Sequence, residues 1–300
     1  ARPSMPNAVH QSTPVGSPHA AYAELHCLTN FTFLRGASHP EELVERASAL
    51  GYTALAITDE CSMAGVVKAH IAAKRCQLKL IIGNELILED GTKIILLAKN
   101  RQGYGKLCHI ITLARRRAKK GQYQVTLNDL KGSTDHLVAI WIPQQRERLD
   151  HGSDLSALKT LFGAQLWLGA VRALDGFDHA RTQDLQAIAS AHTLPIVACG
   201  DVQMHASNRK PLLDTLCAIR HGRSVQSAGR LLQSNAERYL KTCAELTALY
   251  PQQWLTNTRS IAETCTFSLD ELRYEYPEEV IPTGQDANTY LREQVALGAA

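Results

Sequence analysis

The sequence has 300 residues, of which 45% are hydrophobic and 20% charged, which is enough to bury one large core or two modest ones. This composition excludes disorder for most of the chain. The longest apolar stretches, residues 79–88 and 94–98, fall far short of the roughly 20 residues that a membrane-spanning helix needs, so no membrane partner is expected. A net charge of +3 is too mildly basic to establish nucleic-acid binding by itself.

The first twenty residues carry four prolines among small polar residues and lack the apolar core of a secretory signal. We therefore expect residues 1–20 to form a flexible tail. The eight cysteines are scattered, with no C-x-x-C pair and no zinc-ribbon spacing. This pattern favours reduced thiols in a cytoplasmic protein.

From Ala23 onward, short β-branched runs alternate with longer amphipathic segments, which is typical of repeated strand and helix units. The pattern of Ser38, His39, Pro40 and Glu41 resembles a capping box and predicts a helix that runs through Leu50. Further helices are predicted at residues 63–76, 104–118 and 179–192. The predicted strands span residues 23–28, 54–58, 80–88, 93–98, 137–142, 165–171 and 195–199.

Seven strands that are mostly separated by helices favour a parallel α/β sheet, either closed into a barrel or doubly wound. Polar residues distinguish the two arrangements. His26 lies near the end of the first strand, Asp59 and Glu60 follow the second, Glu85 lies in the third, and Asp201 follows the seventh. A barrel brings the carboxyl ends of its strands onto one rim, where these side chains would converge, whereas an open sheet would spread them out.

No strand alternates with the helices predicted after Asp201. These helices span residues 209–222, 235–249, 256–265 and 288–298. The change of pattern predicts a domain boundary near Ser207, with a barrel at residues 21–206 and a mainly helical segment at residues 207–300. The last helix reaches Ala300 without a clear stop signal, so we expect the chain to be part of a longer protein.

His26, Asp59, Glu85 and Asp201 are of the residue types that hold metal ions for phosphate-ester hydrolysis. Each also has an ordinary structural interpretation. A histidine in a strand is usually a satisfied core or surface residue, and a carboxylate after a strand often caps a helix. Both interpretations remain open on residue chemistry alone.

One dense basic run precedes Gly121. It is a candidate for contact with a DNA backbone, and the alternative is a solvated helix end, where cations also favour the helix dipole. The run consists of Arg115, Arg116, Arg117, Lys119 and Lys120.

Several motifs in a fixed order resemble the polymerase and histidinol phosphatase (PHP) domain of C-family DNA polymerases, and the first is most similar to the error-prone, ImuC-type branch. The resemblance extends from Ala23 to the end of the chain. The motifs are ELHCLTNFTFLRGASHP at residues 24–40, AITDEC at 56–61, IGNE at 82–85, LLAKN at 96–100 followed by Gly103 and Tyr104, ACGDVQMH at 198–205, YLK at 239–241 and NTRSIAETC at 257–265.

The resemblance implies a distorted seven-stranded (β/α)7 barrel, followed by a helical segment that leads to the polymerase palm and thumb. The sequence also departs from the metal-binding pattern of the family. Leu28, Glu60 and Gln203 stand at ligand positions, and Lys93 or Ile94 stands where a histidine would begin the fourth strand. His205 is a conceivable substitute ligand. We therefore expect no trinuclear centre, and at most one weakly bound divalent ion at His26, Asp59, Glu85 and Asp201.

The expected function is that of a structural, non-catalytic PHP domain in an error-prone DNA polymerase that copies damaged templates. The family implies Mg²⁺ at palm aspartates beyond residue 300. It also implies template-primer DNA, deoxynucleotides, a sliding clamp and mutagenesis proteins as partners. The alternative is a metal-dependent phosphoesterase or a 3′–5′ proofreading exonuclease. In the structural interpretation, the polar residues form a hydrogen-bonded plug at the barrel rim.

Overall fold

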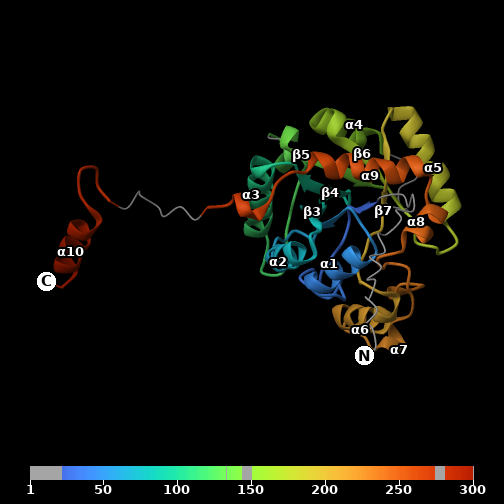
Figure 1. The fold of residues 1–300 in the computed structure, drawn as a ribbon, viewed down its shortest axis with the longest axis horizontal. Helices are drawn as coiled ribbons and strands as arrows, with labels where there is room; N and C mark the ends of the chain where they lie inside the picture. The colour runs from blue at the N-terminus through green and yellow to red at the C-terminus, as the bar shows by residue number, and fades with distance from the viewer. Residues whose placement is uncertain (1–21, 133, 144–150, 274–280, 300) are drawn as a thin grey trace, which may run out of the picture. The chain divides into compact units, whose positions relative to one another are not determined.

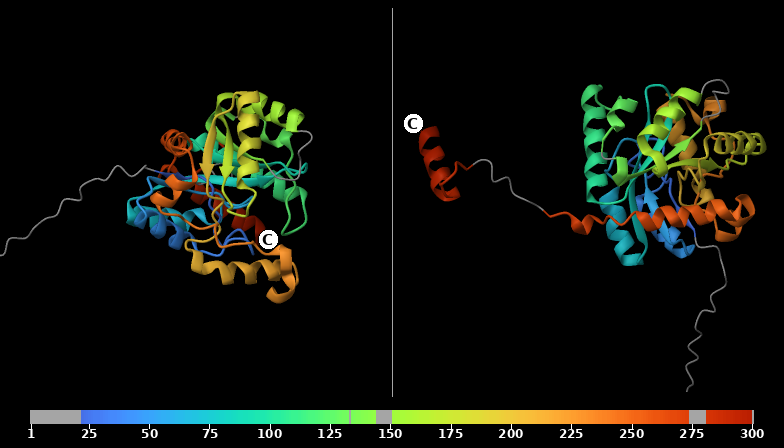
Figure 2. Two further views of the ribbon diagram at one scale, coloured as in Figure 1. Left: turned by 90° about the vertical axis from the view of Figure 1, so that its right-hand side faces the viewer. Right: turned by 90° about the horizontal axis from the view of Figure 1, so that it is seen from above.

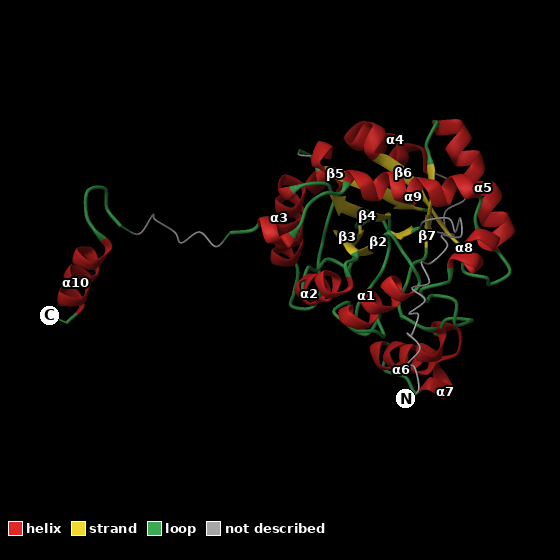
Figure 3. Cartoon of the chain, viewed as in Figure 1, coloured by secondary structure: helices red, strands yellow, loops and turns green. Residues whose placement is uncertain are grey.

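The computed structural model describes residues 22–132, 134–143, 151–273 and 281–299 (Figure 1). One compact unit extends to Ser268 and a second begins at Leu269. Helices surround the strands of the first unit (Figure 3). The strands are β1 (Ala23–Glu24), β2 (Ala54–Ile57), β3 (Lys79–Ile87), β4 (Lys93–Ala98), β5 (Leu137–Ile142), β6 (Leu166–Val171) and β7 (Ile196–Cys199).

The helices of the first unit match most of the sequence predictions to within a few residues, and α4 and α7 were not predicted. They are α1 (Pro40–Ala49), α2 (Val66–Cys76), α3 (Arg101–Arg117), α4 (His151–Phe162), α5 (Asp178–His192), α6 (Lys210–Arg220), α7 (Val225–Ala228), α8 (Cys243–Leu249) and α9 (Gln252–Thr264).

The strands form one sheet in chain order, and the direction of β4 departs from the parallel arrangement that we expected. β4 runs antiparallel to both β3 and β5, whereas the other neighbouring pairs are parallel. Only residues 88–92 connect β3 to β4, and a parallel crossover needs about a dozen residues or more. The first residue of β4 therefore lies at the same end of the barrel as the last residues of the parallel strands.

The sheet curves into a nearly closed barrel, as the resemblance implied. Regular β1 is shorter than predicted because pairing to β2 stops at Glu24. The chain beyond β1 instead contacts the residues after β7. Cys27 forms a parallel bridge with Val202, the Leu28 N–H donates to the Val202 carbonyl at 2.8 Å, and the Val202 N–H donates to the His26 carbonyl at 3.0 Å. These bonds join the first and last segments of the barrel.

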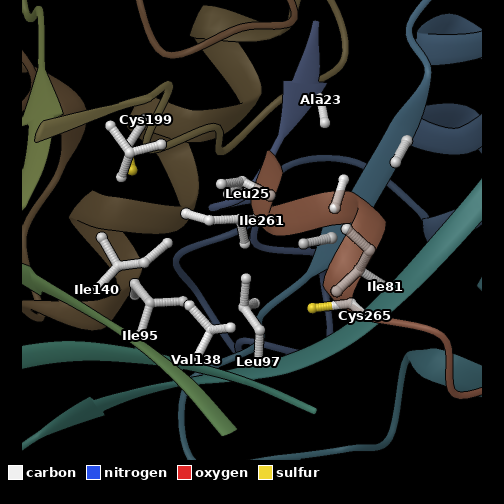
Figure 4. Close-up of a cluster of buried hydrophobic side chains, with 14 of the residues drawn as sticks. Ala23, Leu25, Ile81, Ile95, Leu97, Val138, Ile140, Cys199, Ile261 and Cys265 are labelled. Carbon is white, nitrogen blue, oxygen red and sulfur yellow. The ribbon is translucent and has the colours of Figure 1, made fainter. Parts of the chain in front are cut away.

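Helix α9 packs across the amino end of the barrel. Ile261 and Cys265 from this helix lie among side chains of the barrel interior, including Leu25, Ile95 and Leu97 (Figure 4). Helix α9 contacts the first residues of β1 and β3. The Ala23 N–H donates to Thr258 Oγ1 at 3.1 Å, and Lys79 Nζ donates to the Ala262 carbonyl at 2.6 Å. The polar residues lie at the opposite, carboxyl end of the barrel.

Two sequence predictions of helix boundaries were wrong. The capping box begins one residue later than expected, because His39 is the N-cap of α1 and its N–H donates to Glu42 at 2.8 Å. Residues 235–242 are not helical. Their backbone instead follows the barrel, where Tyr239 forms a bridge with Met204 and the Gln203 N–H donates to the Arg238 carbonyl at 2.9 Å.

The segment after Ser207, where we expected a domain boundary, belongs to the first compact unit as far as Ser268. Helices α6 and α7 lie beside α1 and away from α4 (Figures 1 and 2). Leu213 of α6 packs against Ala37 and Met204 in a small second cluster. This cluster anchors α6 to the loop before α1.

The second unit contains α10 (Ala287–Gly298), whose N-cap Asp286 accepts hydrogen bonds from the N–H groups of Asn288 and Thr289. Among the residues that the structure describes, no helix combines the length and apolar character needed to cross a membrane. The predicted flexible tail at residues 1–20 lies outside the described residues.

Candidate metal centre

The alternation of side chains along β3 and β4 places two charged residues inside the barrel mouth. Ile81 of β3 lies in the barrel core, and Glu85, four residues later, faces the same side. Ile95 of β4 also lies in the core, so Lys93, two residues earlier, faces inward. The reversed direction of β4 therefore delivers a lysine to the rim where parallel strands deliver their last residues.

Three of the four predicted metal ligands come together at this mouth. His26 Nε2 lies 2.7 Å from Glu85 Oε2 and 3.6 Å from Asp201 Oδ1. One potential ligand atom from each residue lies within 4.8 Å of the others, and all three residues are buried. Asp201 has a φ of +46°, in the left-handed region that costs a residue with a side chain about 1–3 kcal/mol.

Positively charged side chains contact the carboxylates of this cluster. Lys93 Nζ lies 3.0 Å from Glu85 Oε2 and 3.7 Å from Asp201 Oδ1. Arg35 Nη1 donates to Glu85 Oε1 at 2.6 Å, and Arg238 forms an ion pair with Asp201. Each carboxylate of the cluster therefore already has a cationic partner from the protein.

The protonation equilibria follow from burial and from these pairs. Burial alone would raise the pKa of Glu85, but Lys93, His26 and Arg35 outweigh it and hold that pKa well below the ordinary range. Burial lowers the pKa of His26 and of Lys93. Burial, reinforced by Arg35, also lowers the pKa of Arg238 to about 10.

The donor set does not fit a metal centre of the kind that the fold family implies. Glu85 Oε2, a candidate ligand atom, is shared by His26 and Lys93, and an ammonium group 3.0 Å away repels an incoming cation. Two buried atoms, His26 Nδ1 and Asp201 Oδ1, have no hydrogen-bond partner among the described residues. Those two atoms, together with the convergence of His26, Glu85 and Asp201, favour an ion.

Asp59, the fourth predicted ligand, lies apart from the cluster. Its carboxylate accepts hydrogen bonds from the Thr29 N–H at 2.8 Å and from the Thr32 hydroxyl at 2.6 Å. Burial raises the pKa of Asp59, and these hydrogen bonds oppose the increase. Asp59 therefore joins the loop after β1 to the end of β2.

The other predicted rim residues bind protein groups. Glu60 forms an ion pair with Arg35 and accepts a hydrogen bond from the Tyr123 hydroxyl at 2.9 Å. Gln203 accepts a hydrogen bond from Gln233 at 3.3 Å. His205 Nδ1 lies 2.8 Å from Ser38 Oγ, so the conceivable substitute ligand is turned toward the loop before α1.

The basic run lies at the end of α3 and after it, and its five side chains differ in their contacts. Arg115 donates to the Cys61 carbonyl at 3.1 Å, and Arg117 forms an ion pair with Asp129 at 2.6 Å. Both arginines therefore hold neighbouring segments of the protein. Arg116, Lys119 and Lys120 are exposed.

Sequence reasoning missed Arg35 and Arg238 as parts of the mouth. Arg35 lies within the first motif, and the resemblance of that motif to the family did not mark this arginine as part of the site. Arg238 follows the barrel in a segment that was predicted to be helical. The bridge between Met204 and Tyr239 and the bonds from Gln203 and Met204 to the Arg238 carbonyl bring it to Asp201. The residues around Arg238 in the sequence do not predict that this side chain lies at the barrel mouth.

Comparison with known proteins shows which family this barrel resembles. The PHP domain family matches residues 24–143. An error-prone DNA polymerase from Methylococcus capsulatus is 50% identical over 95% of this chain, and one from Pseudomonas aeruginosa is 48% identical over 94%. The chain spans 27% of the length of each of these two relatives.

Two solved structures show weaker similarity. A putative metal-dependent phosphoesterase from Bifidobacterium adolescentis is 17% identical, with a TM-score of 0.43, over 62% of this chain and 88% of its own. An amidohydrolase from Chromobacterium violaceum is 16% identical, with a TM-score of 0.46, over 61% of this chain and 88% of its own. The sequence matches carry the assignment: residues 24–143 match the PHP domain family, and nearly the whole chain is similar to a part of error-prone DNA polymerases.

Proposed function

We propose that this chain is a structural, non-catalytic PHP barrel at the N-terminal end of an error-prone DNA polymerase. The observation that carries the proposal is the pairing of both mouth carboxylates with side-chain cations. Lys93 contacts Glu85 and Asp201, Arg35 contacts Glu85, and Arg238 contacts Asp201. Metal-assisted hydrolysis needs these carboxylates as open ligands.

The pairing also supports a structural role, because it stabilises the buried carboxylates in the folded protein. A buried carboxylate without a partner is strongly destabilising, because its charge loses the hydration that water would supply. In this barrel, the protein's own cations compensate for that loss. The mouth therefore remains stable without an ion.

The two relatives, both named error-prone DNA polymerases, support the polymerase activity in the rest of the proposal, which concerns the whole protein. It would extend a primer on template DNA from deoxynucleotides across damaged positions in the cytoplasm, using Mg²⁺ at aspartates outside this chain. A sliding clamp and proteins of a mutagenesis pathway would be its partners. Primer extension by the whole polymerase on a template with a lesion tests this part.

Metal content of the purified chain tests the barrel part. We expect dialysis against Zn²⁺ or Mn²⁺ to leave the wild type with far less than one ion per chain, since Lys93 and Arg238 repel cations. Replacing both with alanine removes the cations from Asp201 and leaves Glu85 paired with Arg35 and His26, so it should increase divalent-ion binding. The same substitution at exposed Arg259 removes a cation far from the mouth and serves as the control.

Hydrolysis of a generic phosphate ester and of a 3′-labelled primer, with added Mn²⁺ or Zn²⁺, completes the test. We expect no turnover by the wild type. Near-stoichiometric metal in the wild type, with turnover abolished by His26→Ala, would contradict the proposal.

The second candidate function is that of a metal-dependent phosphoesterase or proofreading exonuclease. One observation favours it, which is the convergence of His26, Glu85 and Asp201 with two unpartnered buried atoms. The cations around the same carboxylates oppose it.

For DNA contact, we propose the exposed part of the basic run. Arg116, Lys119 and Lys120 are exposed, whereas Arg115 and Arg117 bind protein groups. Phosphate contacts of this kind weaken as salt increases. A salt-independent DNA affinity, or none at low salt, would contradict this assignment.

A further inference from the structure

One sequence motif lies at the opposite end of the barrel from the mouth. It is LLAKN at residues 96–100, followed by Gly103 and Tyr104. The motif spans the end of β4 and the start of α3. It contacts residues 266–267, which follow α9 and come just before the second unit.

The carbonyl group of Lys99 binds the backbone of the chain that leaves α9. It accepts hydrogen bonds from the Thr266 N–H at 2.9 Å and from the Phe267 N–H at 3.2 Å. The Thr266 hydroxyl donates to the same oxygen at 3.2 Å. The Lys99 side chain has its own partner, because Nζ donates to the Asp135 carbonyl at 3.0 Å. Lys99 therefore joins three separate segments of the chain.

An aromatic pair reinforces these hydrogen bonds. The rings of Tyr104 and Phe267 are stacked, with 4.8 Å between their centroids and 25° between their planes. Gly103 allows this arrangement, because a Cβ atom there would lie 2.1 Å from the His136 carbonyl oxygen. The first turn of α3 can therefore lie against the residue before β5, and this approach sets the position of Tyr104.

These contacts lie where the chain passes from one unit to the other. The first compact unit ends at Ser268, one residue after Phe267. Local segments of a protein can open at a lower free energy than the whole fold. The stacked pair and the bonds to Lys99 oppose such an opening at the end of α9.

We propose that Tyr104 is a positioning residue that, together with Lys99, fixes the point at which the chain leaves the barrel for the second unit. In the whole polymerase, this anchor holds the connection between the barrel and the rest of the protein. The proposal rests on the structural role proposed above and deepens it. It assigns that role to the amino end of the barrel, where α9 packs, and not to the mouth.

Hydrogen exchange of the whole 300-residue chain, followed by NMR, tests the anchor. Tyr104→Ala removes the stacked ring and should speed exchange of the Thr266 and Phe267 amides at least about twofold. The amides of Leu97 and Ile140 in the barrel core should exchange at the wild-type rate. Tyr104→Phe keeps the ring and should restore slow exchange at both anchor amides.

Gln102→Ala is the matched control, because Gln102 is exposed in the same turn of α3. It should leave exchange at Thr266 and Phe267 unchanged. Equal exchange in the wild type and Tyr104→Ala would overturn the proposal. Equal acceleration at Leu97 and Ile140 would also overturn it, because the ring would then stabilise the whole barrel and not the anchor.

Primer extension by the whole polymerase tests the positioning role. Tyr104→Ala should lower the rate at least about twofold, because a displaced connection misplaces the groups that react. Tyr104→Phe should restore the rate. Faster exchange at the anchor with an unchanged rate of extension would overturn the positioning role. No extension by the wild type would instead contradict the proposed polymerase function, and the exchange rates would still decide whether the anchor exists.

Discussion

At the scale of single residues, the mouth of the barrel depends on charges that come from separate parts of the chain. Lys93 was recognisable in the sequence as a departure from the histidine of the family. Arg35 and Arg238 were not recognisable, because their effect depends on contacts with Glu85 and Asp201 far along the chain. The sequence therefore identified the types of ligand and Lys93, but it could not identify the two arginines that pair with the carboxylates.

The basic run offers a test at this scale. The Arg117 guanidinium, with help from Thr126, lowers the pKa of Asp129 to about 2. Arg117→Ala should raise that pKa toward its ordinary value of 3.8, as measured by NMR titration of the carboxyl carbon. Arg116→Ala, the adjacent exposed control, should leave it unchanged.

The sign of the pH effect follows from the depressed pKa. The contribution of Asp129 to stability is fully present above pH 3.8 and is lost as the pH falls toward about 2. The wild type should therefore be more stable than Arg117→Ala at neutral pH, and the difference should vanish near pH 2. A difference that persists there would contradict the assignment.

At the scale of elements, local patterns predicted where strands and helices lie but not how they pair. The strand at residues 93–98 was predicted with its exact bounds, yet its antiparallel direction was not, because hydrophobic periodicity contains no information on direction. The helix predicted from Asn235 begins only at Cys243, since bonds to Gln203 and Met204 extend the preceding backbone. Tertiary contacts overrode local propensity in the second case.

The start of α2 offers a test at the element scale. A Cβ atom at Gly65 would lie 2.7 Å from Asp59 Oδ2 and 2.9 Å from Thr29 Oγ1. Gly65→Ala should therefore lower the free energy of unfolding by about 1–3 kcal/mol, as overpacking does in other buried sites. Chemical denaturation provides the measurement.

Gly105 provides the matched control. It lies within α3, and a Cβ atom there would meet nothing within 4 Å. Gly105→Ala should stabilise the protein by about 0.5–1 kcal/mol, because alanine loses less backbone entropy in a helix. Equal effects of the two substitutions would show that the Asp59 loop yields to the added methyl group.

At the scale of the whole molecule, the barrel and the segment after Ser207 form one unit. The pattern of the sequence predicted seven strands, the family resemblance implied that they close into a distorted barrel, and the structure confirms both. The sequence could not show that α9 completes the core, because Ile261 and Cys265 contact residues that lie more than 100 positions earlier in the chain. A domain boundary inferred from a change of pattern misses such contacts.

Truncation tests this dependence. A chain that ends at residue 206 lacks α9 and exposes the core around Leu25 and Leu97, so we expect it to lose cooperative thermal unfolding. A chain that ends at Ser268 retains the whole first unit and should unfold cooperatively. Cooperative unfolding of the shorter chain would show that the barrel is stable without α9.

The contact between Ala23 and Thr258 has a consequence for synthesis on the ribosome. The two residues are 235 positions apart, and ribosomes add about 5–20 residues per second. The first strand therefore emerges roughly 12–47 s before the helix that covers it. During this interval, its apolar side chains need protection by a chaperone or by non-native contacts, although they belong to the first part of the domain to be made.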